Sequence, residues 1–153
     1  MNQYQLCEIE RTLGFTYPPS FHSAVDKFTV LCGRPGFKHA FGSAKLLLSV
    51  SEIISERKSL GDRARRGVSG ISLLPAESVG DISYSTVVPF LRDQDSEAPD
   101  IFTDTYAFDL ESQGPEYSVI VVTYSDLMIV NSWDGFLAFF QWMSEFVASK
   151  ETS

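Results

Sequence analysis

The sequence predicts a single-domain α+β protein in which helices pack on one mainly antiparallel sheet. Apolar residues recur at helical spacing near the start, runs rich in β-branched and aromatic residues fill the second half, and helical spacing returns at the end. The length of 153 residues fits one domain, which we assign to residues 1–149, with residues 150–153 as a loose C-terminal tail.

Two helices are expected first. Leu6, Ile9 and Leu13 recur at helical spacing and predict a helix of about ten residues. Gly14 follows at a position where helices often end in a left-handed residue. A second helix is expected to begin at the proline pair 18–19, because proline is tolerated in the first turn of a helix but not in its interior.

The middle of the chain predicts a turn, a strand and an exposed helix. Residues 31–37, LCGRPGF, hold two glycines and a proline and are interpreted as a turn or loop. The apolar run LLLSV at 46–50 favours a strand, and Ser51 is expected to cap the helix that follows. The basic run from Arg57 to Arg66 on this helix is interpreted as a solvated face, with phosphate contact as the alternative.

The second half predicts strands and a closing helix. Five strand-like runs follow one another: ISLL, STVVPF, TYAFDL, YSVIVVTY and LMIVN. The final helix carries phenylalanines at intervals of three and four residues, with Ser132 as its expected cap. Trp133 and Trp142 face either the core or a neighbouring chain, so the oligomeric state stays open. The expected core residues are Phe21, Phe28, Phe108, Val121, Phe136 and Phe140.

Several short motifs resemble those of the SUKH superfamily, the SMI/KNR type of bacterial immunity proteins and fungal cell-wall synthesis regulators. LGFTYPPSFHSAVDKF is similar to the opening LGxxLPxxYxxFL motif of that family: Leu13, Gly14 and Pro18 match, Tyr17 replaces the leucine, and Phe21 replaces the aromatic residue. VVPFLRD, YAFDL and NSWDGFLAFFQWM resemble its later strands and closing helix in the same order. LCGRPG stands where the family commonly has an Asn-Gly-Gly turn.

The resemblance implies a SUKH-like domain that binds other proteins and has no reaction of its own. Bacterial members typically neutralise a cognate toxin, and an immunity gene is expected beside the toxin gene. The resemblance therefore implies an immunity or antitoxin-like protein. A housekeeping interaction scaffold with the same fold is the first alternative, and a small hydrolase or metal-dependent enzyme that uses an acidic loop is the second.

Negative charge is concentrated in the second half of the chain. The net charge is −8, with +3 in residues 1–92 and −11 in residues 93–153. Residues 92–111, here called the acidic segment, contain seven carboxylates and one arginine. Grouped carboxylates steer a basic partner and repel nucleic acid. We expect part of the binding surface for a basic toxin domain, such as a nuclease, to be formed by Asp93, Asp95, Glu97, Asp100 and Asp104.

Ordinary solubilising charge is the alternative interpretation of the acidic segment, and a calcium loop is disfavoured. Asp93, Asp95, Glu97 and Asp104 fall at positions 1, 3, 5 and 12 of a calcium-loop register. Position 6 requires glycine and holds Ala98, and position 12 requires a bidentate glutamate. We therefore expect no metal site and no cofactor.

The sequence does not favour an enzyme. Only His22 and His39 offer an imidazole base, and GVSGI lacks the GxSxG pattern of a nucleophile elbow. His22 is interpreted as a side chain at the edge of a helix. Cys7 and Cys32 are interpreted as buried free thiols. The N-terminus resembles no signal peptide and no apolar run is long enough to span a bilayer, so a cytoplasmic location is expected.

Overall fold

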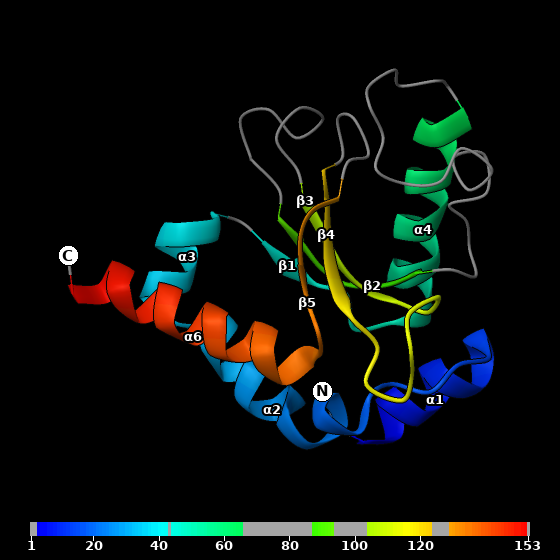
Figure 1. The fold of residues 1–153 in the computed structure, drawn as a ribbon, viewed down its shortest axis with the longest axis horizontal. Coiled ribbons are helices and arrows are strands. Elements are labelled where there is room, and N and C mark those ends of the chain that lie inside the picture. Colours follow the sequence, from blue (N-terminus) through cyan, green and yellow to red (C-terminus); the bar gives the residue numbers. More distant parts are fainter. Residues whose placement is uncertain (1–2, 43, 66–86, 94–103, 124–128, 153) are drawn as a thin grey trace.

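The computed structural model describes residues 3–42, 44–65, 87–93, 104–123 and 129–152. Five strands form one antiparallel sheet in the order β1-β2-β3-β4-β5, and helices lie on both sides of it (Figure 1). The α+β prediction is confirmed. The elements are α1 (Gln3–Leu13), α2 (Pro19–Cys32), α3 (Pro35–Phe41), β1 (Lys45–Leu46), α4 (Val50–Arg65), β2 (Val87–Asp93), β3 (Asp104–Asp109), β4 (Val119–Thr123), β5 (Ile129–Trp133) and α6 (Phe136–Thr152).

The first two helices follow the sequence signals closely. Gly14 adopts a φ of 74°, and its N–H donates to the carbonyl of Glu10 at 2.9 Å, which closes the last turn of α1. Pro19 occupies the first turn of α2. Both helix predictions are confirmed.

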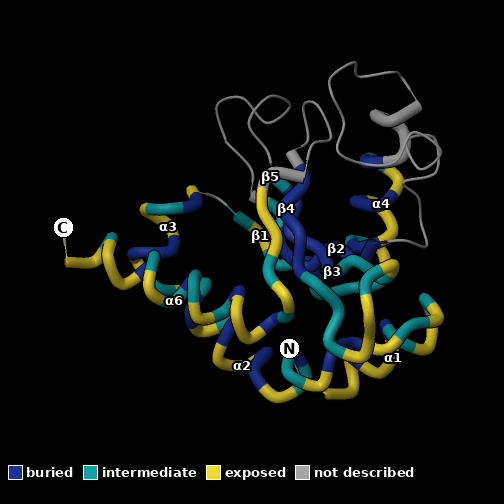
Figure 2. The backbone as a smooth tube through the Cα atoms, in the orientation of Figure 1, coloured by how far each residue is buried: buried dark blue, intermediate teal, exposed yellow. Residues whose placement is uncertain are grey.

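An aromatic core joins α2 and α6 to one face of the sheet. Phe136 lies at its centre, with its ring centroid 5.0 Å from that of Phe21 and 5.4 Å from that of Phe28. Phe90 of β2 stacks on Phe108 of β3 at 4.8 Å below these rings. The central strands β2, β3 and β4 are largely buried, whereas β5 is exposed over part of its length (Figure 2). Five of the six expected core residues are buried, and Phe140 is partly exposed.

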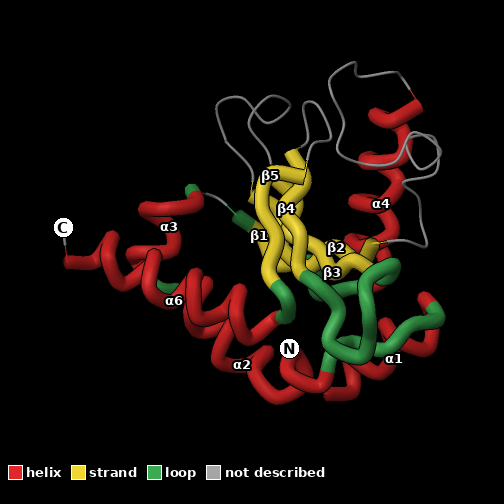
Figure 3. The backbone as a smooth tube through the Cα atoms, in the orientation of Figure 1, coloured by secondary structure: helices red, strands yellow, loops and turns green. Residues whose placement is uncertain are grey.

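Helix α4 covers the opposite face of the sheet (Figure 3). Glu56 of α4 accepts a hydrogen bond from Thr105 of β3, and Arg57 donates to the carbonyl of Val87 in β2. Both faces of β3 are consequently covered, and its four central residues, 105–108, are all buried. In the neighbouring strand β4, residues 119–122 are buried as well. Burial on both faces of a strand accounts for a near-continuous apolar run such as that of β4.

Three local predictions are wrong. Of residues 31–37, interpreted as a turn or loop, only Gly33 and Arg34 form the turn; Pro35 begins α3, because a proline is compatible with the first turn of a helix. Of the strand expected at 46–50, only Leu46 pairs in the sheet, together with the preceding Lys45, as β1. Ser132 lies in β5 and does not cap α6.

The cap of α4 also differs from the prediction. Ser49, not Ser51, precedes the helix, and its Oγ accepts the N–H of Glu52 at 3.2 Å. The carboxylate of Glu52 in turn accepts the hydroxyl of Ser49 and the N–H of Leu48. This reciprocal pairing is a variant of the capping box, and it fixes where the helix begins.

At the other end of the chain, α6 continues to Thr152, through residues for which the sequence predicts a loose tail. The predicted strand ISLL, at 71–74, lies outside the described residues.

Candidate functional site: an acidic hairpin and three polar clusters

The acidic segment begins on β2, includes β3 and ends in the turn after β3. Strands β2 and β3 with the connection between them, residues 94–103, are here called the acidic hairpin. Asp93 and Asp104 are Cα partners on the last pair of the ladder, so the two strands bring both ends of the connection together. Asp95, Glu97 and Asp100 belong to that connection and lie outside the described residues. The structure therefore positions two of the five predicted site residues.

The remaining carboxylates of the acidic segment lie at the opposite end of β3. Asp109 ends the strand, and its Oδ1 accepts the N–H of Glu111 at 3.0 Å, which stabilises the turn that follows. Asp104 and Asp109 therefore lie at opposite ends of β3. Asp109 and Glu111 belong to a turn, away from the end of the hairpin that carries Asp93 and Asp104.

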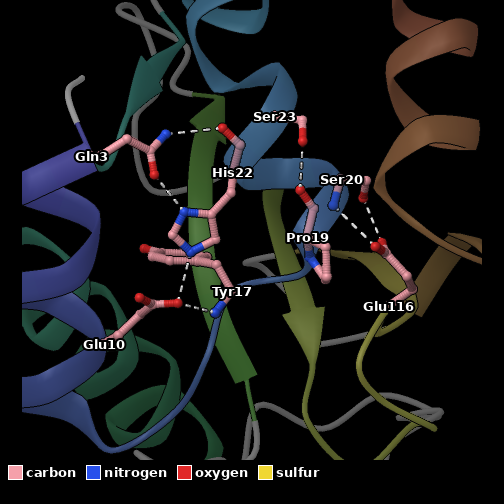
Figure 4. Close-up of polar contacts among 8 residues, drawn as sticks. All are labelled: Gln3, Glu10, Tyr17, Pro19, Ser20, His22, Ser23 and Glu116. Atoms are coloured by element: carbon pink, nitrogen blue, oxygen red, sulfur yellow. Dashed lines mark hydrogen bonds and ion pairs between the residues drawn. The ribbon is translucent and has the colours of Figure 1, made fainter.

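A polar cluster fastens α1 to α2 (Figure 4). Glu10 Oε2 accepts the backbone N–H of Tyr17 at 2.7 Å and lies 2.9 Å from His22 Nε2. On the other side of the ring, His22 Nδ1 lies 2.8 Å from Gln3 Oε1, and Gln3 Nε2 donates to the His22 carbonyl at 3.0 Å. Both ring nitrogens of His22 are thus engaged by groups from α1.

A second cluster caps the N-terminus of α2. Glu116, from the connection between β3 and β4, accepts both the backbone N–H of Ser20 at 3.0 Å and its hydroxyl at 2.5 Å (Figure 4). A carboxylate at this position satisfies a free N–H and opposes the positive end of the helix dipole. Ser23 Oγ donates to the Pro19 carbonyl at 3.1 Å.

These two clusters contain the residue types of a Ser–His–acid triad in a different arrangement. In such a triad the serine hydroxyl bonds to the imidazole, which bonds to the acid through its other nitrogen. Here the Ser20 hydroxyl is directed to Glu116, and the ring of His22 is held between Glu10 and Gln3. Within the described hydrogen bonds, the contacts fasten helices to one another and to the β3–β4 connection.

A third cluster, the α4 ion network, lies between α4 and the sheet. Glu56 is 3% exposed, and its two carboxylate oxygens accept the Thr105 hydroxyl at 2.8 Å and Arg92 Nη1 at 3.0 Å. Arg57 is 5% exposed, and its Nε donates to the Val87 carbonyl at 2.6 Å. The interpretation of the basic run as a solvated face is therefore wrong for Arg57.

Burial sets the protonation behaviour around this network. Burial lowers the pKa of Arg57 and raises the pKa of Tyr17, which the negative charge of Glu10 raises further. A buried charge that keeps a hydrogen-bonded partner is a structural element whose removal is costly. Sequence patterns missed this network because the partners of Glu56 and Arg57 are distant in sequence. The Ser-x-x-Glu pattern at Ser49 is a local signal for the start of α4, but it does not indicate the network of Glu56 and Arg57.

An open cleft of about 420 Å³ lies beside the α4 ion network. Lys45 and Arg92 contribute positive charge to its walls, and Glu52 and Glu56 contribute negative charge. Lys45 Nζ lies 2.7 Å from Glu52 Oε2, and Arg92 pairs with Glu56. Because each of these positive charges is paired with a negative one, the four charged side chains of the cleft carry no net charge that would attract a charged ligand.

The two cysteines are free thiols with different environments. Cys7 is exposed, so its assignment to the interior is wrong, because the apolar face of α1 is narrow and its buried side chains are Leu6 and Ile9. Cys32 is half-buried, and burial raises the pKa of its thiol to about 12. Among the described residues, no three His, Cys, Asp or Glu side chains converge as a metal site requires.

No protein-family model, curated protein or solved structure matches the chain. The SUKH resemblance therefore stays a prediction. In the described part of the chain, no helix combines the length and the apolar character needed to cross a membrane.

Proposed function

We propose that the chain is a non-catalytic immunity or antitoxin-like protein of the SUKH type that neutralises a cognate toxin by direct binding. Part of the surface that meets a basic partner, such as a nuclease domain, is formed by Asp93, Asp95, Glu97, Asp100 and Asp104 of the acidic segment. The observation that carries the proposal is the pairing of Asp93 with Asp104 at the end of the β2–β3 ladder. The protein acts in the cytoplasm, where its two free thiols are stable.

The acidic hairpin supports the proposal because its two strands belong to the interior of the sheet, which holds the ends of the acidic connection in place. Strands β2 and β3 lie inside the sheet, with neighbours on both sides. Asp93 and Asp104 are Cα partners at the end of this ladder, so both residues stand at the base of the connection. Binding residues are commonly carried by a loop on such a scaffold.

The polar clusters support a role without chemistry. His22, Glu10, Ser20 and Glu116 are engaged in contacts between elements of the fold. Glu56 is held by Thr105 and Arg92 in the interior. Each of these groups has a structural use that accounts for its position.

Association kinetics test the proposal. Asp93→Asn, Asp95→Asn and Glu97→Gln together remove three negative charges from the hairpin. We expect slower association with a toxin domain found among the neighbouring genes at low salt, and a smaller difference at high salt, where the attraction is screened. Stopped-flow or surface-based binding measures both rates.

A control variant removes the same total charge elsewhere. Glu8→Gln, Asp26→Asn and Glu111→Gln change three exposed carboxylates on α1, on α2 and beyond the far end of β3. This variant is expected to associate nearly as fast as the wild type. Equal rates for the hairpin variant and the control at low salt contradict a binding role for the hairpin.

A further inference from the structure

We propose that a half-buried aromatic face beside β5 binds arginine side chains of the basic partner. This aromatic face consists of Trp133, Trp142 and Phe146, and the exposed residues Asp134 and Glu145 are close to these residues in the sequence. The inference rests on the proposed function for the basic character of the partner. It places a second contact surface on residues that the structure describes fully.

Strand β5 and helix α6 bring the three rings together. Trp133 ends β5, an edge strand that pairs only with β4, and its ring centroid lies 5.0 Å from that of Trp142. Trp142 and Phe146 lie one turn apart on α6 and stack at 5.5 Å with an angle of 12° between their planes. All three side chains are partly exposed, whereas Phe139 and Met143 on the same helix are fully buried.

Two acidic residues and one lysine border the aromatic face. Asp134 follows Trp133 directly, and Glu145 lies three residues after Trp142, on the same side of α6. Both carboxylate residues are exposed. Aromatic rings beside carboxylates suit a guanidinium group, which stacks on a ring and donates hydrogen bonds to an acid at the same time.

One ring of the face already accepts a cation from the same chain. Lys150 Nζ lies 5.2 Å from the centroid of the Phe146 ring, within the range of a cation–π interaction. Partly exposed tryptophans are also the residues that dominate binding energy at protein interfaces. The aromatic face therefore offers partly exposed rings for a partner, and one of these rings already contacts a positive charge.

The outer edge of β5 favours side-chain recognition over the addition of a strand. The N–H of Ser132 donates to Asn131 Oδ1 at 2.8 Å, so this edge donor is already used within the strand. The ladder with β4 is also irregular between Val121 and Val122. An irregular edge with one backbone donor already occupied is a poorer template for pairing with another strand. A basic segment that presents arginines is consequently the occupant that fits this face.

Both tryptophans of the chain lie in the aromatic face, so intrinsic fluorescence reports on it directly. A six-arginine peptide is titrated into the full-length chain and the tryptophan emission is followed. We expect a saturable change in emission, with tighter binding than a six-lysine peptide, because guanidinium stacks better on aromatic rings. No saturable change, or equal affinity for the two peptides, overturns the assignment to arginine.

Rim variants locate the binding site. Asp134→Asn with Glu145→Gln is expected to weaken peptide binding about fivefold, the effect of losing two exposed ion pairs. Glu8→Gln with Asp26→Asn removes the same charge from exposed positions on α1 and α2 and is expected to leave the affinity unchanged. Equal effects of the two variants overturn the proposal, since binding then follows total charge.

The cognate toxin domain separates this inference from the proposed function. If Asp134→Asn with Glu145→Gln leaves toxin binding intact while the hairpin variant slows it, the aromatic face is refuted and the proposed function stands. If the rim variant weakens toxin binding, the face is confirmed as a contact. If the toxin domain does not bind the wild-type chain, the proposed function fails, whatever the peptides show.

Discussion

Replacing Phe136 with alanine tests whether the aromatic core holds α6 on the sheet. Phe136 is 0% exposed, and its ring lies within 5.0 to 6.1 Å of six other phenylalanine rings. These rings come from α2, β2, β3 and α6 itself. The side chain therefore joins α6 to α2 and to two strands of the sheet.

The cost follows from the lost contacts and the cavity that remains. Removing a fully buried phenylalanine ring typically lowers the free energy of unfolding by about 3 to 5 kcal/mol. For a chain of this size each kcal/mol lowers the melting temperature by about 2 to 4 °C, so a decrease of roughly 6 to 20 °C is expected. The neighbouring Leu137 is 61% exposed, and its replacement by alanine should change the stability by less than about 0.5 kcal/mol.

Urea unfolding followed by far-UV circular dichroism measures both variants against the wild type. The difference between adjacent positions is the informative quantity, because both substitutions affect the helix propensity of α6 similarly. Equal stability of Phe136→Ala and Leu137→Ala refutes the placement of Phe136 at the centre of the core.

Two further predictions concern close packing and charge. Gly36→Ala should lower the melting temperature measurably. An added Cβ would lie only 2.3 Å from the Val147 carbonyl oxygen, so α3 must shift away from α6. An unchanged melting temperature contradicts this packing. The Lys45 ammonium lowers the pKa of Glu52 below its ordinary value of 4.5, so the stabilisation from this carboxylate is present above pH 4.5 and lost as the pH falls through the lowered pKa. Glu52→Gln should therefore reduce stability more at pH 7 than at pH 3 in urea titrations, and a pH-independent difference is the contrary result.

Local signals in the sequence predict much of this fold. The apolar spacing before Gly14 and the proline pair at 18–19 define the first two helices, because their start and stop signals lie within a few residues of each helix. The strands from β2 to β5 are visible as β-branched runs for the same reason. Helix α3 was missed because a short helix has little periodicity, and its proline and glycine dominate the pattern.

The polar contacts depend on residues that are distant in sequence, and this limits what the sequence predicts. From the sequence alone, Glu56 is expected to be an exposed charge on α4. Its partners Arg92 and Thr105 are on strands that come much later in the chain, so no local pattern indicates that it is buried. Ser20 is likewise capped by Glu116, 96 residues away. The acidic hairpin was predicted because charge concentration is a property of composition, which requires no knowledge of the fold.

Protection of cells against a toxin tests the proposed function most directly. The measurement is the growth of cells that express a toxin domain found among the neighbouring genes, with and without co-expression of the chain. The account predicts that the wild-type chain restores growth and forms a complex with the purified toxin domain. Continued growth arrest in the presence of folded wild-type chain, with no complex between the purified proteins, contradicts the account.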